Sequence, residues 1–229
     1  MISVVIPTYE AEHSLAATLS ALVPGVVAGL IREVIIVDGG SRDRTLKIAD
    51  TAGATILTVD RGRGQQLAAG AEAARGDWLL FLHADTVLER GWEDEVGAYI
   101  ERCETGARPE RAAAFRFALD DIGFMPRVIE FGVLLRCTLF RLPYGDQGLL
   151  IPRRVYQSRG GYQAMPLMED VELIGRLGRA KPVILRTRAV TSAARYHRDG
   201  YFLRASRNIA CLGMYYLRVP NRFIARIYG

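Results

Sequence analysis

Two groups of acidic residues stand where carboxylates could do chemistry. Asp85 follows the apolar run 78–82, two residues after His83, and Glu169 and Asp170 open an amphipathic segment much later. A carboxylate at the end of a buried strand suits Mn²⁺ or Mg²⁺, which proteins hold with one or two carboxylates plus substrate phosphates. In the second pair, one acid could take a proton from a hydroxyl. Adjacent helical residues diverge by about 100°, so only one of the two would face the site, and we favour Asp170.

Each of these residues also has an ordinary structural interpretation. An imidazole at His83 would favour Mn²⁺ over Mg²⁺ and would point to the side of Asp85 if the strand continued. Taken alone, however, His83 is better explained as a structural histidine. Glu169 and Asp170 could simply interact with the positive end of a helix dipole. The catalytic interpretation therefore depends on the other motifs.

The opening residues predict a ligand-binding loop. Residues 2–7 form an apolar, strand-like run, and Pro7 is expected to stop the strand because proline cannot extend the hydrogen-bond ladder. The next loop would lie at the carboxyl edge of the sheet, where open α/β folds bind ligands. There Thr8, Tyr9 and Glu10 could contact a nucleobase and ribose. An ordinary strand-to-helix turn is the alternative.

Asp38 ends a second apolar run, residues 33–38. Its carboxylate could accept a hydrogen bond from a base N–H or a ribose hydroxyl, or it could cap the following helix. The dinucleotide fingerprint G-x-G-x-x-G is missing after the first run, which argues against NAD. We expect the carboxyl groups of Asp38, Asp85 and Asp170 to surround a shared cleft.

Two loops could contact the rest of a substrate. Arg61 and Arg63 alternate with glycines before a helix, which suits phosphate, although a solvated basic turn is common. Asp146 and Gln147 lie on a glycine-flanked loop that could shape an acceptor pocket. The Arg-Tyr-His-Arg cluster at 195–198 could clamp a diphosphate or add a metal ligand, unless it is a surface basic patch.

The order of apolar runs predicts an α/β fold. Strand-like runs alternate with helical patterns in the first half, which indicates a Rossmann-like, mostly parallel central sheet flanked by helices. These strands are apolar throughout, as in sheets covered on both faces. The predicted strands are residues 2–7, 33–38, 55–59, 78–82, 112–119, 149–151 and 183–185. The predicted helices are residues 13–22, 43–52, 65–74, 92–103, 128–139, 169–177 and 200–217.

Neither repeats nor a low-complexity linker divide the chain. A single domain over residues 1–229 is therefore expected. Within it we expect a nucleotide-binding half, 1–103, and an acceptor half, 104–229, that ends in a helix.

Composition narrows the classes of partner. The net charge is +5, and 28 of the 30 basic residues are arginines, which suits phosphate. No aromatic-basic nucleic-acid module is present, so a small phosphorylated ligand is expected and nucleic acid is not. The three cysteines lack a CxxC pairing, which argues against disulfides and zinc and favours a reduced, cytoplasmic protein.

The ends and apolar stretches of the sequence give no sign of a signal peptide or a membrane span. The stretches 128–140 and 201–217 are interrupted by charges. Ordinary core-facing helices are favoured there. Peripheral contact with the inner membrane face or pairing of two subunits in a homodimer are the alternatives.

Taken in order, the motifs resemble family 2 inverting glycosyltransferases of the GT-A fold. Each motif alone is weak, whereas their order and spacing over nearly the whole chain are specific. The motifs are Val-Val-Ile-Pro-Thr-Tyr at 4–9, Val-Ile-Ile-Val-Asp-Gly-Gly-Ser-Arg-Asp at 34–43, the glycine-rich loop at 61–64, Leu-Phe-Leu-His-Ala-Asp-Thr at 80–86, Gly-Asp-Gln-Gly at 145–148 and Met-Glu-Asp at 168–170. The 61–66 loop together with residues 82–86 is similar to a small bacterial branch of the family linked to arsenosugar biosynthesis.

The resemblance implies roles for individual residues. The nucleotide pocket would be lined by Pro7, Thr8, Tyr9 and Glu10, and Asp38 would contact the base. Asp85 matches the last acid of the family's DxD metal motif. Glu169 and Asp170 match the acidic pair whose Asp is the usual base.

The sequence departs from the family pattern at two places. His83 replaces the first acid of DxD. Leu67 and Ala68 stand where many members have a basic residue and Asn, and Arg61 or Arg63 would then supply the missing charge.

The resulting hypothesis is a metal-dependent inverting glycosyltransferase of the hexosyltransferase type. It would move a sugar from a nucleoside diphosphate sugar to the hydroxyl of a small-molecule or lipid-linked acceptor, with Mn²⁺ or Mg²⁺ as cofactor. A sugar nucleotidyltransferase is one alternative, although it normally has a lysine-containing glycine-rich loop after the first strand. A non-catalytic relative that binds nucleotide or membrane is the other, and His83 in place of an acid supports it.

Overall fold

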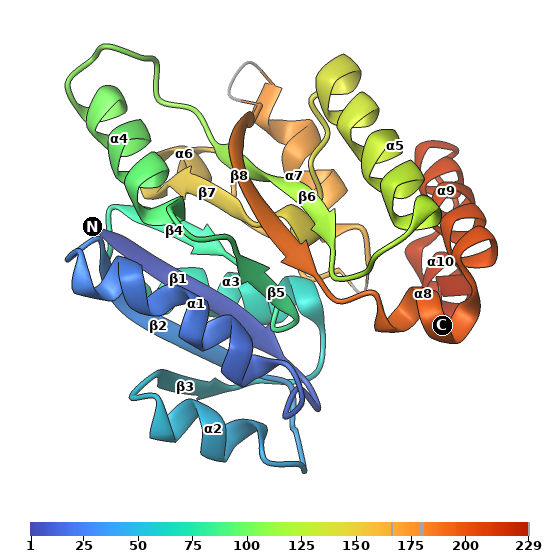
Figure 1. Ribbon diagram of the computed structural model, residues 1–229, viewed down its shortest axis with the longest axis horizontal. Coiled ribbons are helices and arrows are strands. Elements are labelled where there is room, and N and C mark those ends of the chain that lie inside the picture. Colours follow the sequence, from blue (N-terminus) through green and yellow to red (C-terminus); the bar gives the residue numbers. More distant parts are fainter. Residues whose placement is uncertain (166, 179–180, 229) are drawn as a thin grey trace.

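The strand-like runs of both halves join into one sheet of eight strands, in the order β3-β2-β1-β4-β7-β6-β8-β5. The computed structural model (Figure 1) describes residues 1–165, 167–178 and 181–228. Its strands are β1 (Ile2–Thr8), β2 (Ile31–Asp38), β3 (Thr55–Thr58), β4 (Trp78–Phe81), β5 (Thr86–Leu88), β6 (Ala113–Leu119), β7 (Leu149–Pro152) and β8 (Val183–Thr191). Its helices are α1 (Leu15–Val27), α2 (Thr45–Thr51), α3 (Arg63–Ala73), α4 (Trp92–Glu104), α5 (Phe124–Phe140), the 3₁₀ helix η1 (Gly145–Gln147), α6 (Arg153–Ser158), α7 (Glu169–Leu177), α8 (Ala194–Asp199), α9 (Tyr201–Tyr216) and α10 (Asn221–Tyr228).

The first half supplies the parallel part of the sheet. Strand β1 pairs in parallel with β2 and β4, and β2 pairs in parallel with β3. Strand β7 is antiparallel to β4 and β6, and β5 is antiparallel to β8 at the far edge. The predicted α/β class with a mostly parallel, helix-flanked sheet is confirmed. Because β5 from the first half pairs with β8 from the second, the sheet runs across the expected division at residue 103.

Two apolar clusters cover the two faces of the sheet. Alternate residues of β1 and β4 point to opposite clusters, as the two-residue period of a strand requires. One cluster packs the sheet against α1, α2 and α4, and the other packs it against α3, α6 and α7. A third, smaller cluster holds α5, α8 and α9 to the end of β6. The loops at the carboxyl ends of β1, β2 and β4 are thereby fixed on a rigid base.

The expectation that Pro7 stops the first strand was wrong by one residue. Pro7 lies within β1, opposite Val37, and the strand ends at Thr8. The Val5 carbonyl accepts the Leu82 N–H, so the backbone polar groups of Val5 point toward β4. Strand backbone alternates with a period of two residues, so the backbone nitrogen of Pro7 also points to the β4 side. Strand β4 has already ended there, at Phe81. The missing N–H of Pro7 therefore breaks no ladder bond, and proline is tolerated.

The other differences concern short elements. The sequence predicted neither β5 nor the helices α6, α8 and α10, which have between three and eight residues. Strand β8 extends to Thr191, well beyond the predicted end at residue 185. Its second half alternates arginine with smaller residues, a pattern that carries little apolar signal.

Candidate active site

The candidate site is built around Asp170, the second residue of α7. The Tyr162 hydroxyl donates to Asp170 Oδ1 at 2.9 Å, and the Gly145 backbone N–H donates to Asp170 Oδ2 at 3.1 Å. The two donors fix the orientation of the carboxylate. Burial and the neighbouring Asp170 charge raise the pKa of Tyr162 well above its usual value, so this hydroxyl keeps its proton. The Asp170 carboxylate is thus held in one orientation.

Tyr162 was missed by the sequence analysis. It is 5% exposed, and its ring packs edge-on against Phe81 at 4.9 Å between centroids. Its own N–H donates to the Tyr156 hydroxyl at 2.9 Å. A tyrosine after two glycines carries no sequence signal for this role, because the contact joins residues brought together only by the fold.

Position 145 must be glycine because the side chains of Asp170 and His83 lie against its backbone. A Cβ added there would lie 2.2 Å from Asp170 Oδ2 and 2.5 Å from His83 Nε2. Both distances are far below van der Waals contact, so any side chain at this position would displace the two groups. Asp170 and His83 therefore face the same point beside the backbone of η1.

His83 is oriented by Arg63. The Arg63 guanidinium lies 3.0 Å from His83 Nδ1, and because arginine can only donate, Nδ1 is the acceptor. Burial, with the Arg63 and Arg195 charges, lowers the pKa of His83 well below its usual value, so the ring is neutral. A neutral ring that accepts at Nδ1 carries its proton on Nε2. Neither nitrogen then offers a free lone pair to a metal.

Arg63 also pairs with Glu169. The Arg63 Nε lies 3.5 Å from Glu169 Oε1, and only 2% of the Glu169 side chain is exposed. Although burial opposes it, the Glu169 and Asp170 carboxylates raise the pKa of Arg63, which stays charged. Burial and the Asp170 charge raise the pKa of Glu169. Met168, just before the pair, has a left-handed φ of 67°, an uncommon conformation for a non-glycine residue.

Asp85 and Asp146 supply carboxylates next to this group. The charge of Asp85 contributes to raising the pKa of both Arg63 and Asp146, after larger contributions from other groups. Burial, opposed by Arg136 and reinforced by Asp170, raises the pKa of Asp146. The predicted geometry in which His83 and Asp85 share one side of a continuing strand was wrong, because β4 ends at Phe81 and a turn follows.

These residues were tested as a site for a divalent ion. Among the described residues, no group of three or more His, Cys, Asp or Glu side chains forms a metal cluster. Asp85 makes no side-chain hydrogen bond to another described residue, and the buried Asp146 Oδ1 has no hydrogen-bond partner. One or two free carboxylates fit an ion whose other ligands come from substrate phosphates. Asp85 and Asp146 fit this description, whereas His83 does not.

Unpartnered polar atoms gather in this region. Of seven buried side-chain N or O atoms without a hydrogen-bond partner in the described part of the chain, five belong to His83, Tyr144, Asp146 and Glu169. Buried polar groups in native proteins are nearly always paired, and exceptions often mark functional sites. The arrangement therefore can take a polar substrate between a fixed carboxylate, an imidazole N–H and a guanidinium.

The predicted nucleotide loops form a separate group. Asp38 is fully buried, and its carboxylate accepts four hydrogen bonds, from the Thr8 and Ser41 hydroxyls and from the N–H groups of Gly40 and Ser41. Contact with a base would require one of these bonds to be exchanged. The side-chain amide of Gln66, on α3, donates to the Thr8 and Val37 carbonyls at 2.8 and 2.7 Å, which ties this group to the helix that carries Arg63.

The surface of these loops presents Tyr9 and Arg61. Tyr9 is 42% exposed, and the Arg61 guanidinium lies 3.9 Å above its ring. Glu10 has a φ of 50°, and its carboxylate accepts the Arg42 N–H at 2.8 Å. The two arginines of the glycine-rich loop thus diverge: Arg61 lies over Tyr9, and Arg63 contacts His83 and Glu169.

Gln147 and part of the 195–198 cluster make contacts within the protein. Gln147 is 1% exposed, and its amide bonds to the Phe115 carbonyl and to Arg136, so it supports the loop from inside. In the 195–198 cluster, His197 pairs with Asp121 at 3.1 Å and Arg198 with Asp199. Only Arg195 of that cluster acts on His83.

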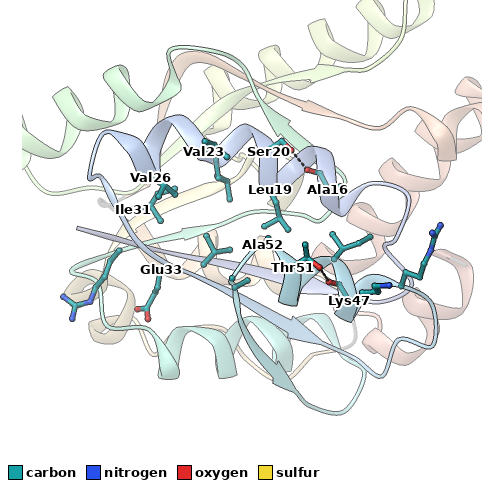
Figure 2. A pocket seen from close by; sticks show the side chains of 17 residues that line it. Ala16, Leu19, Ser20, Val23, Val26, Ile31, Glu33, Lys47, Thr51 and Ala52 are labelled. Atoms are coloured by element: carbon teal, nitrogen blue, oxygen red, sulfur yellow. Dashed lines mark hydrogen bonds between the residues drawn. The ribbon is translucent and has the colours of Figure 1, made fainter.

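A hollow of about 800 Å³ lies elsewhere, between α1 and α2 against β2 (Figure 2). Apolar side chains such as Leu19, Val23 and Ile48 line it, with Arg44 and Lys47 at its rim. None of the predicted site residues borders this hollow. Its carboxylate, Glu33, already accepts hydrogen bonds from Ser3 and Arg75.

Comparison with known proteins gives several relatives. The chain is 32% identical over 95 residues to glucosyl-3-phosphoglycerate synthase of Mycolicibacterium paratuberculosis, covering 38% of this chain and 29% of that protein. It is 32% identical over 115 residues to undecaprenyl-phosphate 4-deoxy-4-formamido-L-arabinose transferase of Pseudomonas aeruginosa, covering 46% and 33%. It is 31% identical over 157 residues to a PGL/p-HBAD biosynthesis glycosyltransferase of Mycobacterium tuberculosis, covering 61% and 60%. The chain thus spans less than two thirds of the length of each of these relatives.

Solved structures show the same fold. Residues 1–349 of TarS from S. aureus superpose with a TM-score of 0.66 at 14% identity, covering 99% of this chain and 69% of that one. Glucosyl-3-phosphoglycerate synthase from Mycobacterium tuberculosis, in complex with Mn²⁺, UDP and glucosyl-3-phosphoglycerate, gives 0.55 at 23% identity, covering 84% and 70%. The model of glycosyl transferase family 2 matches residues 3–117, just over half of the 229 residues, including β1, β2 and Asp85. The chain therefore belongs to glycosyl transferase family 2.

Proposed function

We propose that this chain transfers a sugar from a nucleoside diphosphate sugar to an acceptor hydroxyl in a single inverting displacement, with Asp170 as the base. The observation that carries the proposal is the Asp170 carboxylate, fixed by Tyr162 and Gly145 among unpartnered polar atoms. Family membership and relatives named as sugar transferases support it.

The reaction needs one proton acceptor. Asp170 takes the proton of the acceptor hydroxyl as its oxygen attacks the anomeric carbon. The bond from that carbon to the diphosphate oxygen breaks, and its electron pair leaves with the nucleoside diphosphate. Attack from the face opposite the leaving group inverts the configuration, so no covalent nucleophile on the protein is needed. Tyr162 and Gly145 keep the carboxylate aimed while the proton moves.

Positive charge and hydrogen-bond donors support the leaving group and substrate. Arg63 remains charged beside Asp85 and can neutralise a phosphate. The Nε2–H of His83 has no hydrogen-bond partner in the described chain and can donate to a substrate oxygen. Mn²⁺ or Mg²⁺ held by Asp85, with Asp146 as the second carboxylate, would supply Lewis acidity to the diphosphate.

The two substrates are assigned to different loops. Thr8, Tyr9, Glu10, Asp38 and Arg61 would contact the nucleoside of the donor. The loop at Gly145 and Asp146 would receive the acceptor, a small molecule or a lipid-linked one. The names of the relatives include both kinds, a phosphoglycerate and an undecaprenyl phosphate. The link to the arsenosugar branch stays a prediction of the sequence.

A thermal-shift screen of nucleoside diphosphates, with and without Mn²⁺ or Mg²⁺, tests donor binding. A ligand that binds the folded state raises the melting temperature by mass action. We expect at least one nucleoside diphosphate to raise it more with the ion present, and Asp85→Asn to remove the ion-dependent part. No shift with any nucleoside diphosphate under either condition would refute the proposal.

Product analysis separates the alternatives. A glycosyltransferase releases nucleoside diphosphate from the sugar donor. A sugar nucleotidyltransferase would instead make the donor from a sugar phosphate and release pyrophosphate. A non-catalytic relative would show the thermal shift and no release of either product.

A further inference from the structure

Helix α5 presents an apolar stripe to the outside of the molecule. Five large side chains spaced by three or four residues form it, namely Phe124, Val128, Phe131, Leu135 and Leu139, which are 80%, 43%, 65%, 48% and 63% exposed. At 3.6 residues per turn these positions fall within an arc of about 80°. A surface helix of a globular protein normally shows polar residues on this side.

The opposite face of α5 is the one that packs on the protein. Ile129 and Val133 contact the cluster of Phe117 and Leu119 at the end of β6. The Glu130 carboxylate turns inward as well and accepts the Leu119 N–H at 2.9 Å. The outward stripe is therefore an additional apolar surface, which the fold itself does not use.

Helix α9 repeats the arrangement. Phe202, Ile209, Tyr216 and Leu217 are 78%, 72%, 57% and 80% exposed. The other positions on the same arc are occupied by small uncharged residues, Ser206, Ala210 and Gly213. The charged residues of α9 point elsewhere: Arg204 is 4% exposed, and both Arg204 and Arg207 pair with Asp199 at 3.3 Å.

The two stripes belong to one end of the molecule. Helices α5, α9 and α10 lie together there, at the right of Figure 1, and α5 contacts α9. Twenty large hydrophobic side chains are exposed in the described part of the chain, and fifteen of them lie in the segments 122–139 and 202–227. We call the stripes of α5 and α9 the outward apolar face.

The segments that carry this face are rich in arginine. The segments 122–142 and 193–228 contain ten arginines and two acidic residues, whereas the rest of the chain has twenty basic and twenty-three acidic residues. A second copy of this chain would bring the same positive charge to the contact, which disfavours a dimer through this face. An anionic lipid surface offers both the apolar layer and the opposite charge.

We propose that the outward apolar face docks the protein on the surface of a bilayer that contains anionic phospholipid. No described helix is both long and apolar enough to cross a bilayer, so α5 and α9 would lie along the interface. One face of each helix packs on the protein, as the sequence pattern favoured, and the proposal takes up the alternative of peripheral membrane contact for the other face.

Docking would bring the bilayer close to the loop that holds Asp170. Arg136 of α5 stacks on the Tyr144 ring at 3.8 Å, directly before Gly145. Asn221, at the start of α10, donates to the Leu167 carbonyl at 3.3 Å, just before α7. The acceptor side of the site is thus bordered by α5, which would touch lipid, and by α10, which contacts α9. A lipid-linked acceptor follows from this placement, and that part alone rests on the proposed function.

Sedimentation of the full chain with vesicles tests the proposal. We expect binding to vesicles of phosphatidylcholine with about one third phosphatidylglycerol, and little binding to phosphatidylcholine alone. The double variant Phe131→Glu, Ile209→Glu should have an affinity for these vesicles at least about tenfold lower, because it places charges in the apolar contact. Val27→Glu, at an 82% exposed site at the end of α1, is the matched control and should bind as the original chain does.

Three results would overturn the docking proposal. They are equal binding to both vesicle types, unchanged binding of the double variant, and a stable dimer in solution that the double variant dissociates. Circular dichroism and melting temperature establish that the variants are folded. The nucleotide thermal shift is measured without vesicles, so a failure of docking and a failure of sugar transfer are distinguished.

Discussion

The loops around Asp38 and the cluster around Asp170 differ in how completely their buried polar atoms are hydrogen-bonded within the chain. Asp38 accepts four hydrogen bonds from its own chain and is fully buried. Around Asp170, five buried polar atoms of four neighbouring residues have no hydrogen-bond partner in the described chain. The Asp38 carboxylate is fully hydrogen-bonded within the chain, whereas the second region holds buried polar atoms that a ligand can bond.

This difference predicts which substitutions lower the stability of the fold and which lower turnover. A satisfied buried network stabilises the fold, because removing any member leaves unpaired donors or acceptors. Unpaired groups lower stability and persist where a ligand uses them. Substitutions around Asp38 should therefore affect unfolding first, whereas those around Asp170 should affect turnover first.

The largest effect is expected for Asp170→Asn. The amide cannot accept the acceptor's proton, so kcat should fall by about 10² to 10⁴, the usual contribution of a general base. Nucleoside diphosphate release measures the loss, and the nucleotide thermal shift should be retained. Asp94→Asn, in the first turn of α4, is the control for the same chemical change at an exposed carboxylate. Turnover that survives in Asp170→Asn would remove the base assignment.

The counterpart is Asp38→Ala. It leaves four donors without their acceptor, so the free energy of unfolding should fall by about 2–4 kcal/mol. Urea unfolding of Asp38→Ala and Asp170→Ala, side by side, measures the contrast. If both variants lost stability equally, the two regions would not differ in the way described.

Gly145→Ala tests the close approach within the cluster. Its Cβ would collide with Asp170 and His83, and overpacking of this kind costs about 1–3 kcal/mol. We expect kcat to drop and the base to be displaced. Gly97→Ala on α4 is the control, because nothing lies within 4 Å of its added Cβ. Equal activity of Gly145→Ala and the original chain would show that the two groups move apart freely.

Several residues of the cluster could be named from the sequence because a local signal marks them. Asp85 follows β4, Asp146 follows a glycine, and Glu169 and Asp170 open α7 after the run 165–168. Of these, only Asp85 lies beyond the carboxyl end of a parallel strand, where open α/β folds bind ligands, and the roles assigned to all four stay predictions.

Other features depend on contacts that no local pattern encodes. Tyr162 reaches Asp170 only through the packing of its ring on Phe81, and His83 turns to Arg63 because the strand has ended. The apolar stripes of α5 and α9 have the same periodicity as core-facing helices. Periodicity shows that a helix has an apolar face, and only the fold shows which face is left outside.

Tyr162→Phe isolates one hydrogen bond to the proposed base. A bond to a charged acceptor contributes about 1.5–3 kcal/mol, so kcat should fall roughly tenfold or somewhat more, with little change in KM. Tyr99→Phe removes another buried hydroxyl, bonded to the Arg111 carbonyl at 3.1 Å, and should leave kcat unchanged. A loss of the same size in both variants would indicate a general structural effect.

The smallest expected effect concerns Glu169 and pH. Burial and Asp170 raise the pKa of Glu169 in the folded state, so the folded protein holds this proton more tightly than the unfolded chain does. Its contribution to stability is then fully present below the unfolded pKa and is lost as pH rises through the raised, folded pKa. Glu169→Gln removes the cost of ionising this buried carboxyl, but it also removes the ion pair with Arg63. We therefore expect the free energy of unfolding to rise by about 1 kcal/mol at pH 8 and to stay unchanged at pH 4. Urea midpoints of both proteins across this range measure it. A gain independent of pH would mean that Glu169 does not titrate in this way, and a loss at pH 8 would make its pairing with Arg63 the stronger term.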